Sequence, residues 1–168
     1  MYDLIIIGGG PGGTAAGVYA SRKQLKTLFV TKEWGGQSIV SPDIQNWIGT
    51  PSISGADLAK SMEDHLRAYA GEFVEIRENS LVTNIVKNDD VFSVTFDNGD
   101  TAETRSVLVA TGSKRRQLPT PGADAFEHKG VTYCATCDGP MFSGQDVVVV
   151  GGGNAAFETA AQLLAYTK

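Results

Sequence analysis

The chain is short of cysteine, of basic charge and of long apolar runs. It has only two cysteines and a net charge of −5 among 168 residues. Two cysteines are too few for the disulfide framework of a small secreted domain, and an acidic balance disfavours nucleic acid as a partner. The apolar runs span about four residues, far fewer than a bilayer requires. We therefore expect a cytoplasmic protein that binds neither nucleic acid nor a membrane.

What the chain has in abundance is glycine, with 20 residues, many of which lie in two tight clusters. The first cluster, Gly8 to Gly13, follows the apolar run Leu4–Ile7, which predicts a buried strand of a parallel sheet. Residues 11–23 predict a helix, and Thr27–Thr31 predicts a second strand. These elements together indicate a βαβ unit.

The first cluster has the spacing of a dinucleotide-binding turn. Gly8 permits the tight turn, Gly10 permits close approach of a pyrophosphate, and Gly13 permits close packing of helix and strand. The N–H groups at the start of the helix, near Pro11, would face the phosphates. The alternative is a glycine-rich turn that binds nothing. Thr31 lies where an acidic ribose ligand usually stands, and Glu33 is a doubtful substitute, so the ribose contact stays open.

The middle of the chain changes character. Residues 55–70 predict an amphipathic helix whose stripe comprises Leu58, Met62, His65, Leu66 and Tyr69. Four short strands are expected at residues 73–76, 81–86, 91–96 and 101–105, with an Asn-Gly turn at residues 97–100. They indicate an antiparallel meander inserted in a doubly wound α/β sheet. Residues 107–110 predict a return to a buried strand, and residues 113–123 predict a linker.

A second glycine fingerprint follows near residue 150. Asp146–Val150 predicts a buried strand, Gly151 to Gly153 a turn, and residues 154–166 a helix. Gly151, Gly153 and Ala156 have the accepted variant spacing with alanine in the last position. The pattern predicts a second dinucleotide site at the start of a second Rossmann-like domain, which we do not expect this chain to complete. The alternative is a duplicated fold that binds nothing.

The two cysteines, Cys134 and Cys137, form a CxxC pair followed by Asp138. This spacing lets two sulfurs form a small disulfide ring and commonly lowers the pKa of one thiol. A zinc site would need two further ligands, and only His65 and His128 are at hand, so we predict no metal. The carboxylate of Asp138 could carry protons to and from a thiolate; the alternative is a turn or helix-cap residue.

These motifs together resemble the low-molecular-weight thioredoxin reductases. The resemblance rests on GGGPGG, on Ala110-Thr111-Gly112, on the string CATCDG and on VVGGGNAA a few residues later. The segments Gly35-Gly36-Gln37 and Gln45–Gly49 are similar to the flavin-side loops of that family. CATCDG is the most specific of these motifs, because many flavoproteins share the glycine turns.

The resemblance implies an FAD-binding domain over residues 1–112, a hinge over 113–123 and an incomplete NADPH-binding domain over 124–168. Electrons would pass from NADPH through FAD to the cysteine pair and then to thioredoxin. Cys137 would lie nearest the flavin, Cys134 would attack thioredoxin, and Asp138 would act as acid and base. The residues implied for FAD are Gly8, Gly10, Pro11, Gly13, Thr31, Gly36, Gln37, Asn46, Thr111 and Gly112. Those implied for NADPH are Gly151, Gly153, Asn154 and Ala156.

Other functions stay open at this point. The flavoprotein subunit of an alkyl hydroperoxide reductase shares the same core, and so does a relative that uses ferredoxin or NADH. A third alternative is a flavin-binding fragment without turnover. The family resemblance also implies a homodimer.

Overall fold

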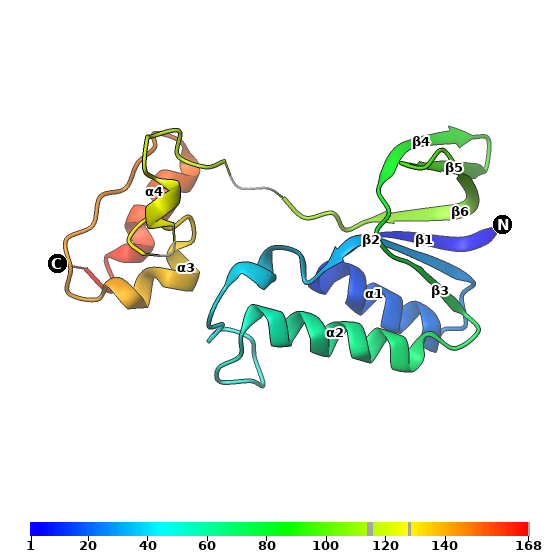
Figure 1. The fold of residues 1–168 in the computed structure, drawn as a ribbon, viewed down its shortest axis with the longest axis horizontal. Coiled ribbons are helices and arrows are strands. Elements are labelled where there is room, and N and C mark those ends of the chain that lie inside the picture. Colours follow the sequence, from blue (N-terminus) through cyan, green and yellow to red (C-terminus); the bar gives the residue numbers. More distant parts are fainter. Residues whose placement is uncertain (114–115, 128, 168) are drawn as a thin grey trace. The chain divides into compact units, whose positions relative to one another are not determined.

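The computed structural model describes residues 1–113, 116–127 and 129–167. The chain divides into two compact units, Met1–Lys114 and Arg115–Lys168 (Figure 1). His128, one of the two histidines considered as zinc ligands, lies outside the described residues.

The first unit is built on one six-stranded sheet with the order β3-β2-β1-β6-β5-β4. Its strands are β1 (Tyr2–Gly9), β2 (Thr27–Trp34), β3 (Val74–Arg77), β4 (Val82–Asn88), β5 (Val91–Phe96) and β6 (Thr101–Val109). β1 pairs in parallel with β2 and β6, and β2 pairs in parallel with β3. β4, β5 and β6 pair antiparallel. The predicted α/β class with a meander is therefore confirmed.

Two details of the predicted meander are wrong. The strand expected at residues 73–76 is β3, which extends the parallel part of the sheet. The strands expected at residues 101–105 and 107–110 are one continuous strand, β6. Its first half pairs with β5 and its second half with β1, so Thr104 has both Phe92 and Tyr2 as partners. A single strand thus joins the meander to the parallel sheet.

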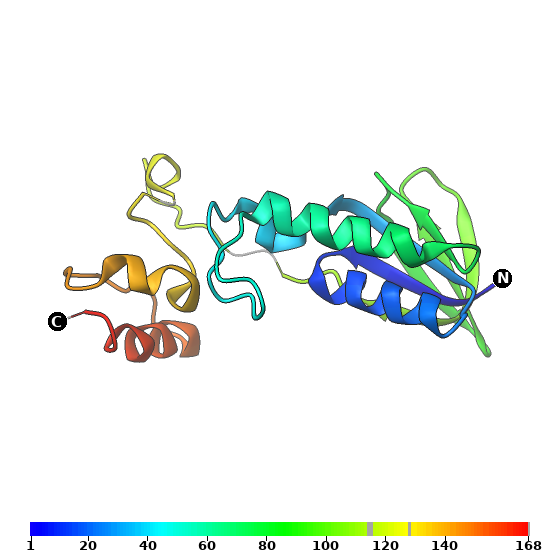
Figure 2. The same ribbon diagram turned by 90° about the horizontal axis from the view of Figure 1, so that it is seen from below.

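Two helices, α1 (Pro11–Arg22) and α2 (Gly55–Ala70), lie side by side along one face of this sheet (Figures 1 and 2). Successive strand residues face opposite sides of a sheet. Ile6 and Phe29 accordingly pack with Val18 and Leu66 of the helices, whereas Ile5 and Leu28 belong to a second cluster with Val94 and Phe96 of β5. The sheet therefore has a buried core on each face.

The described residues of the second unit form two helices and 3₁₀ turns. The helices are α3 (Ala135–Asp138) and α4 (Asn154–Leu163), and the turns are η2 (Asp124–Phe126) and η3 (Gly139–Phe142). The helix predicted after the second glycine cluster is thus present. The strand predicted at residues 146–150 is not formed, and Val148 is 89% exposed. A strand needs a neighbour for its backbone hydrogen bonds, and the described part of this unit contains no other strand.

Candidate active site

The first glycine cluster forms the turn between β1 and α1, where the backbone passes close to itself. Gly8 has φ +122°, and a Cβ atom on it would lie 2.3 Å from the carbonyl oxygen of Ala110. A Cβ on Gly13 would lie 1.8 Å from the carbonyl oxygen of Gly8. Only glycine fits either position, so β1, α1 and the end of β6 meet as the fingerprint requires.

The same turn leaves an open cradle at the start of α1. Gly10 caps the helix in an extended conformation, and no side chain caps the exposed N–H groups. The N–H groups of Gly12 and Gly13 have no partner inside the helix, because the first turn lacks preceding carbonyls. A Cβ on Gly12 would meet nothing within 4 Å, and one on Gly10 would meet only the Cα of Gly36, at 3.8 Å. Open space lined by backbone donors fits the pyrophosphate of a dinucleotide such as FAD.

Two further predicted segments gather around this cradle. The amide of Gln37 donates to the carbonyl oxygen of Ser113 over 2.7 Å. Gln37 belongs to the 3₁₀ turn η1 (Gly36–Val40), where a loop was expected. Thr111 and Gly112 follow β6 at the carboxyl edge of the parallel strands, the edge where open α/β sheets bind ligands. Ser113 was not singled out from the sequence, because a backbone acceptor leaves no residue-type signal.

Thr31 packs directly against the glycine turn. Its side chain is 3% exposed, and its hydroxyl donates to the carbonyl oxygen of Glu33 over 2.5 Å. A Cβ on Gly9 would lie 2.2 Å from the Thr31 hydroxyl oxygen. The Thr31 hydroxyl is therefore already engaged inside the unit, while Glu33 is exposed. A ribose contact from Thr31 stays a prediction.

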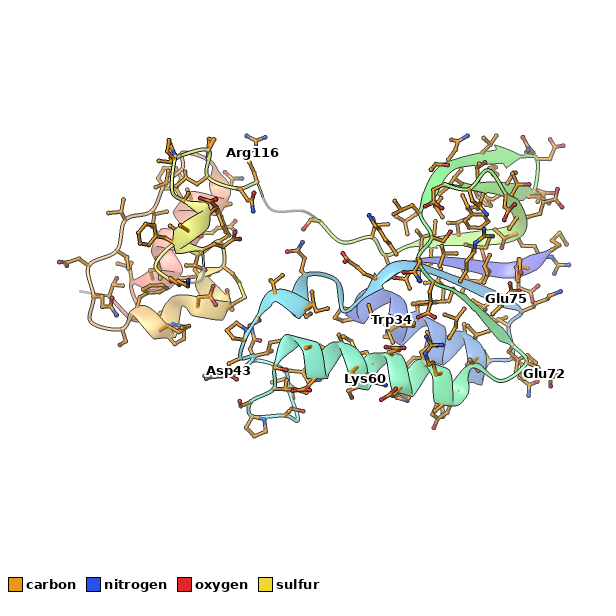
Figure 3. All side chains as sticks on the ribbon, in the orientation of Figure 1. Trp34, Asp43, Lys60, Glu72, Glu75 and Arg116 are labelled. Atoms are coloured by element: carbon orange, nitrogen blue, oxygen red, sulfur yellow. A yellow bond between two sulfur atoms is a disulfide. The ribbon has the colours of Figure 1, made fainter. Side chains whose placement is uncertain are left out.

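Asn46 lies in an exposed loop between η1 and α2. An isolated bridge between Ile44 and Ile53 closes this loop. Asp43, labelled in Figure 3, belongs to the same loop. It accepts hydrogen bonds from Ser52 and Gln45, and these bonds lower the pKa of the Asp43 carboxyl. None of the described hydrogen bonds joins Asn46 to the glycine turn. Its approach to a cofactor stays a prediction.

In the second unit, Cys134 and Cys137 are joined by a disulfide across the start of α3. Cys134 caps the helix, and its Sγ accepts the N–H of Cys137 at 3.2 Å. Cys137 is exposed and Cys134 is half-buried. Reduction of a disulfide takes two electrons, and a thiolate that results can attack another disulfide. The pair can therefore accept two electrons and then attack another disulfide.

Asp138 is tied to the same cysteine by a neighbour that the sequence did not single out, Thr132. The hydroxyl of Thr132 donates to the carboxylate of Asp138, and it accepts the N–H of Cys134 at 3.4 Å. The N–H of Asp138 also donates to the carbonyl oxygen of Cys134, at 3.0 Å. A threonine two residues before a CxxC carries no motif, so only the fold could show this contact.

The redox segment packs on the end of α4. A Cβ on Gly139 would lie 3.2 Å from the ring of Tyr166. The hydroxyl of Thr136 donates to the side-chain oxygen of Gln162 over 3.0 Å. The helix that begins at the second glycine cluster therefore ends against the cysteine pair.

The second glycine cluster repeats the local geometry of the first. Gly151 has φ +148°, compared with +122° for Gly8. Gly153 caps α4 with φ −101° and ψ 179°, close to the −81° and −177° of Gly10. No side chain caps α4, and the N–H groups of Asn154 and Ala155 have no partner within the helix. This turn can also receive a phosphate.

Other candidate residues fall outside these sites. His65, expected on the apolar stripe of α2, is exposed and lies edge-on against Tyr69 at 5.2 Å. Its neighbour Leu66 takes the fully buried position. Among the described residues, no cluster of three or more possible metal ligands occurs. Within residues 1–113, 116–127 and 129–167, no helix reaches the length and apolarity that crossing a bilayer requires.

The class of the protein follows from two features, the glycine turn beside the parallel strands and the CxxC disulfide. Together they define a nucleotide-dependent disulfide oxidoreductase. Residues 2–168 match the family described as pyridine nucleotide-disulphide oxidoreductase. The chain belongs to this family.

Solved thioredoxin reductases are similar to the chain along its whole length. The thioredoxin reductase from Streptococcus pyogenes MGAS5005 has 38% identity and a TM-score of 0.89 over 100% of this chain and 54% of its own. The enzyme from Giardia duodenalis has 32% identity and a TM-score of 0.89 over 99% and 53%. The resemblance inferred from the motifs is confirmed at the level of sequence and fold.

Curated relatives carry other names. One subunit of the alkyl hydroperoxide reductase of Escherichia coli (strain K12) is 37% identical over 96% of this chain and 31% of its own length. An NADH dehydrogenase of Bacillus subtilis (strain 168) is 35% identical over the same shares. The chain thus spans about a third of these relatives and about half of the similar solved structures.

Proposed function

We propose that this chain is the flavin- and dithiol-bearing part of an enzyme that passes electrons from a pyridine nucleotide to a protein disulfide, with NADPH as donor and thioredoxin as acceptor. The observation that carries the proposal is the Cys134–Cys137 disulfide beside Asp138, in a chain that also has two glycine turns suited to dinucleotides. FAD would supply a two-electron carrier between the nucleotide and the disulfide.

The two glycine turns would bind different nucleotides. The turn formed by Gly8, Gly10, Pro11 and Gly13 would hold the FAD pyrophosphate. The segments around Gln37 and Thr111-Gly112 would flank the rest of the cofactor, because the Gln37–Ser113 hydrogen bond keeps them together. The turn at Gly151, Gly153, Asn154 and Ala156 would receive the phosphates of NADPH.

The dithiol would react in two exchanges. The thiolate of Cys134 attacks one sulfur of the substrate disulfide, and the bond between the two substrate sulfurs breaks. The thiolate of Cys137 then attacks the Cys134 sulfur, which reforms the internal disulfide and releases the second substrate sulfur. Two electrons and two protons leave the chain in each cycle, and Asp138 would carry the protons between the thiols.

A second function is favoured by the curated relatives. The similarity of the chain to subunits of alkyl hydroperoxide reductases supports a part of such a reductase, with the same core chemistry and a different disulfide partner. The two functions are distinguished by offering oxidised thioredoxin and, separately, the oxidised disulfide form of a peroxide-reducing protein. The substrate that reoxidises the reduced chain faster identifies the function.

The proposal is tested first by the visible spectrum of the purified chain. We expect a flavin band, release of FAD on denaturation, and loss of the band under anaerobic NADPH with recovery on adding oxidised thioredoxin. A folded chain that takes up no flavin from an excess of FAD would contradict the proposal.

A further inference from the structure

Thr132 stands between the two chemical groups of the redox site. Its hydroxyl oxygen accepts the N–H of Cys134, so its proton is directed to the carboxylate of Asp138. The chain of donors runs from the Cys134 backbone through Thr132 to Asp138. Thr132 and Asp138 are both half-buried.

The backbone of Asp138 is held by a hydrogen bond as well. The N–H of Asp138 donates to the carbonyl oxygen of Cys134, which closes a ring of hydrogen bonds among three residues. This bond fixes the position of the Asp138 main chain. The Thr132 hydroxyl fixes the orientation of the carboxylate, because χ1 and χ2 of an aspartate side chain otherwise rotate between their wells.

We propose that Thr132 is the positioning residue that holds the Asp138 carboxylate for proton transfer during dithiol exchange, an inference that rests on the proposed dithiol function. When the Cys134 thiolate breaks a substrate disulfide, the departing sulfur leaves as a thiolate and takes a proton. The Cys137 thiol later gives up its proton to become the second nucleophile. Asp138 moves these protons, and it does so only while Thr132 orients it.

The chemistry of the departing sulfur makes this role measurable. A thiolate of high basicity, such as that of glutathione, leaves more slowly than an aromatic thiolate of low basicity, so its departure gains more from a proton donor. Loss of orientation should therefore slow exchange with oxidised glutathione and spare exchange with an aromatic disulfide such as 5,5′-dithiobis(2-nitrobenzoate). A residue that only supports the local fold would affect both reactions alike.

The experiment reduces the whole 168-residue chain, removes the reductant and measures the rate of the first exchange with each disulfide, before Cys137 reacts. Thr132→Val keeps the shape and deletes the hydroxyl. We expect it to slow the glutathione reaction about tenfold and to change the aromatic reaction by less than about twofold, since misplacing a catalytic group by ~1 Å costs one to two orders of magnitude. Asp138→Asn should lower the ratio of the glutathione rate to the aromatic rate as Thr132→Val does. Thr132→Ser, which keeps the hydroxyl, should retain the ratio of the parent chain.

Two controls complete the design. Thr136→Val deletes a hydroxyl in the same segment that bonds Gln162, and it should leave the ratio unchanged. The double variant of Thr132→Val with Asp138→Asn should be no slower than Asp138→Asn alone, because residues that act as a unit are not additive. If Thr132→Val does not fold by circular dichroism, Thr132→Ala takes its place.

Equal slowing with both disulfides, no slowing with either, or an additive double variant would overturn the proposal. These rates need neither flavin nor nucleotide. Failure of the chain to bind FAD would thus count against the proposed function alone, whereas an unchanged ratio would count against Thr132 alone.

Discussion

The carbonyl oxygen of Gly8 lies 1.8 Å from the point that a side chain on Gly13 would occupy. The turn and the helix therefore touch through backbone alone. One helix residue earlier, a Cβ on Gly12 would meet nothing within 4 Å. These neighbouring glycines have different tasks, and alanine substitutions separate them.

Gly13→Ala should destabilise the first unit by about 3 kcal/mol, the upper part of the range for overpacking, because the backbone must move to relieve the overlap. Gly12→Ala should leave stability within about 1 kcal/mol of the parent. It should nevertheless weaken FAD binding, because the methyl group enters the open cradle. Urea unfolding and flavin fluorescence titration of both variants check this pair of outcomes. Equal stability of the two variants would contradict the packing described here.

Gln37→Leu removes the donor that ties η1 to Ser113. We expect FAD affinity to fall roughly fivefold or more, since one hydrogen bond contributes about 1 kcal/mol. The thermal midpoint should change little, because the bond is exposed. Gln145→Leu is the matched control, because the exposed Gln145 amide also donates to a backbone carbonyl oxygen, that of Met141. Equal flavin affinity in Gln37→Leu and the parent would remove this segment from the cofactor site.

Glu78 links β2, α2 and the end of β3 in a way that depends on pH. Its carboxylate accepts from the indole of Trp34 at 2.6 Å and from Arg67 at 2.6 Å, and these bonds lower the pKa of Glu78 below its ordinary value of 4.5. A carboxylate with a lowered pKa stabilises the fold above its unfolded pKa and loses that effect as pH falls through its folded pKa.

The melting temperature should therefore fall as pH drops from about 6 to below about 4.5. Trp34→Phe and Glu78→Gln should each reduce this decrease in melting temperature. Asp90→Asn, in an exposed turn, should leave the decrease unchanged. The effect should not exceed about 1 kcal/mol, because both partners of the ion pair are more than a third exposed. A pH profile that Glu78→Gln leaves unchanged would contradict the assignment.

Cys134 should be the cysteine that attacks a substrate, because its sulfur receives the N–H of Cys137. Cys137→Ser should therefore trap a mixed disulfide between Cys134 and oxidised thioredoxin, observed by mass spectrometry. Cys134→Ser should trap far less under the same conditions. Preferential trapping by Cys134→Ser would reverse the assigned roles.

The amphipathic pattern of residues 55–70 predicted α2 with the bounds that the structure shows, where Ser54 caps the helix and Gly71 follows it. The course of β6 could not be foreseen, since local patterns do not reveal that one strand serves two neighbours. Residues 146–150 have the apolar pattern of a buried strand, yet strand formation depends on partners elsewhere in the chain. Thr132 was missed for a related reason, because its importance comes from contacts and carries no motif.

The most direct test of the account asks whether electrons from the nucleotide reach the cysteine pair. The purified chain, loaded with FAD, is treated anaerobically with an excess of NADPH, enough to reduce both the flavin and the disulfide, and thiols are counted after alkylation. We expect bleaching of the flavin band together with two new thiols at Cys134 and Cys137, and we expect no new thiol in the Cys134→Ser, Cys137→Ser double variant. Bleaching that leaves the Cys134–Cys137 disulfide intact would contradict the central claim.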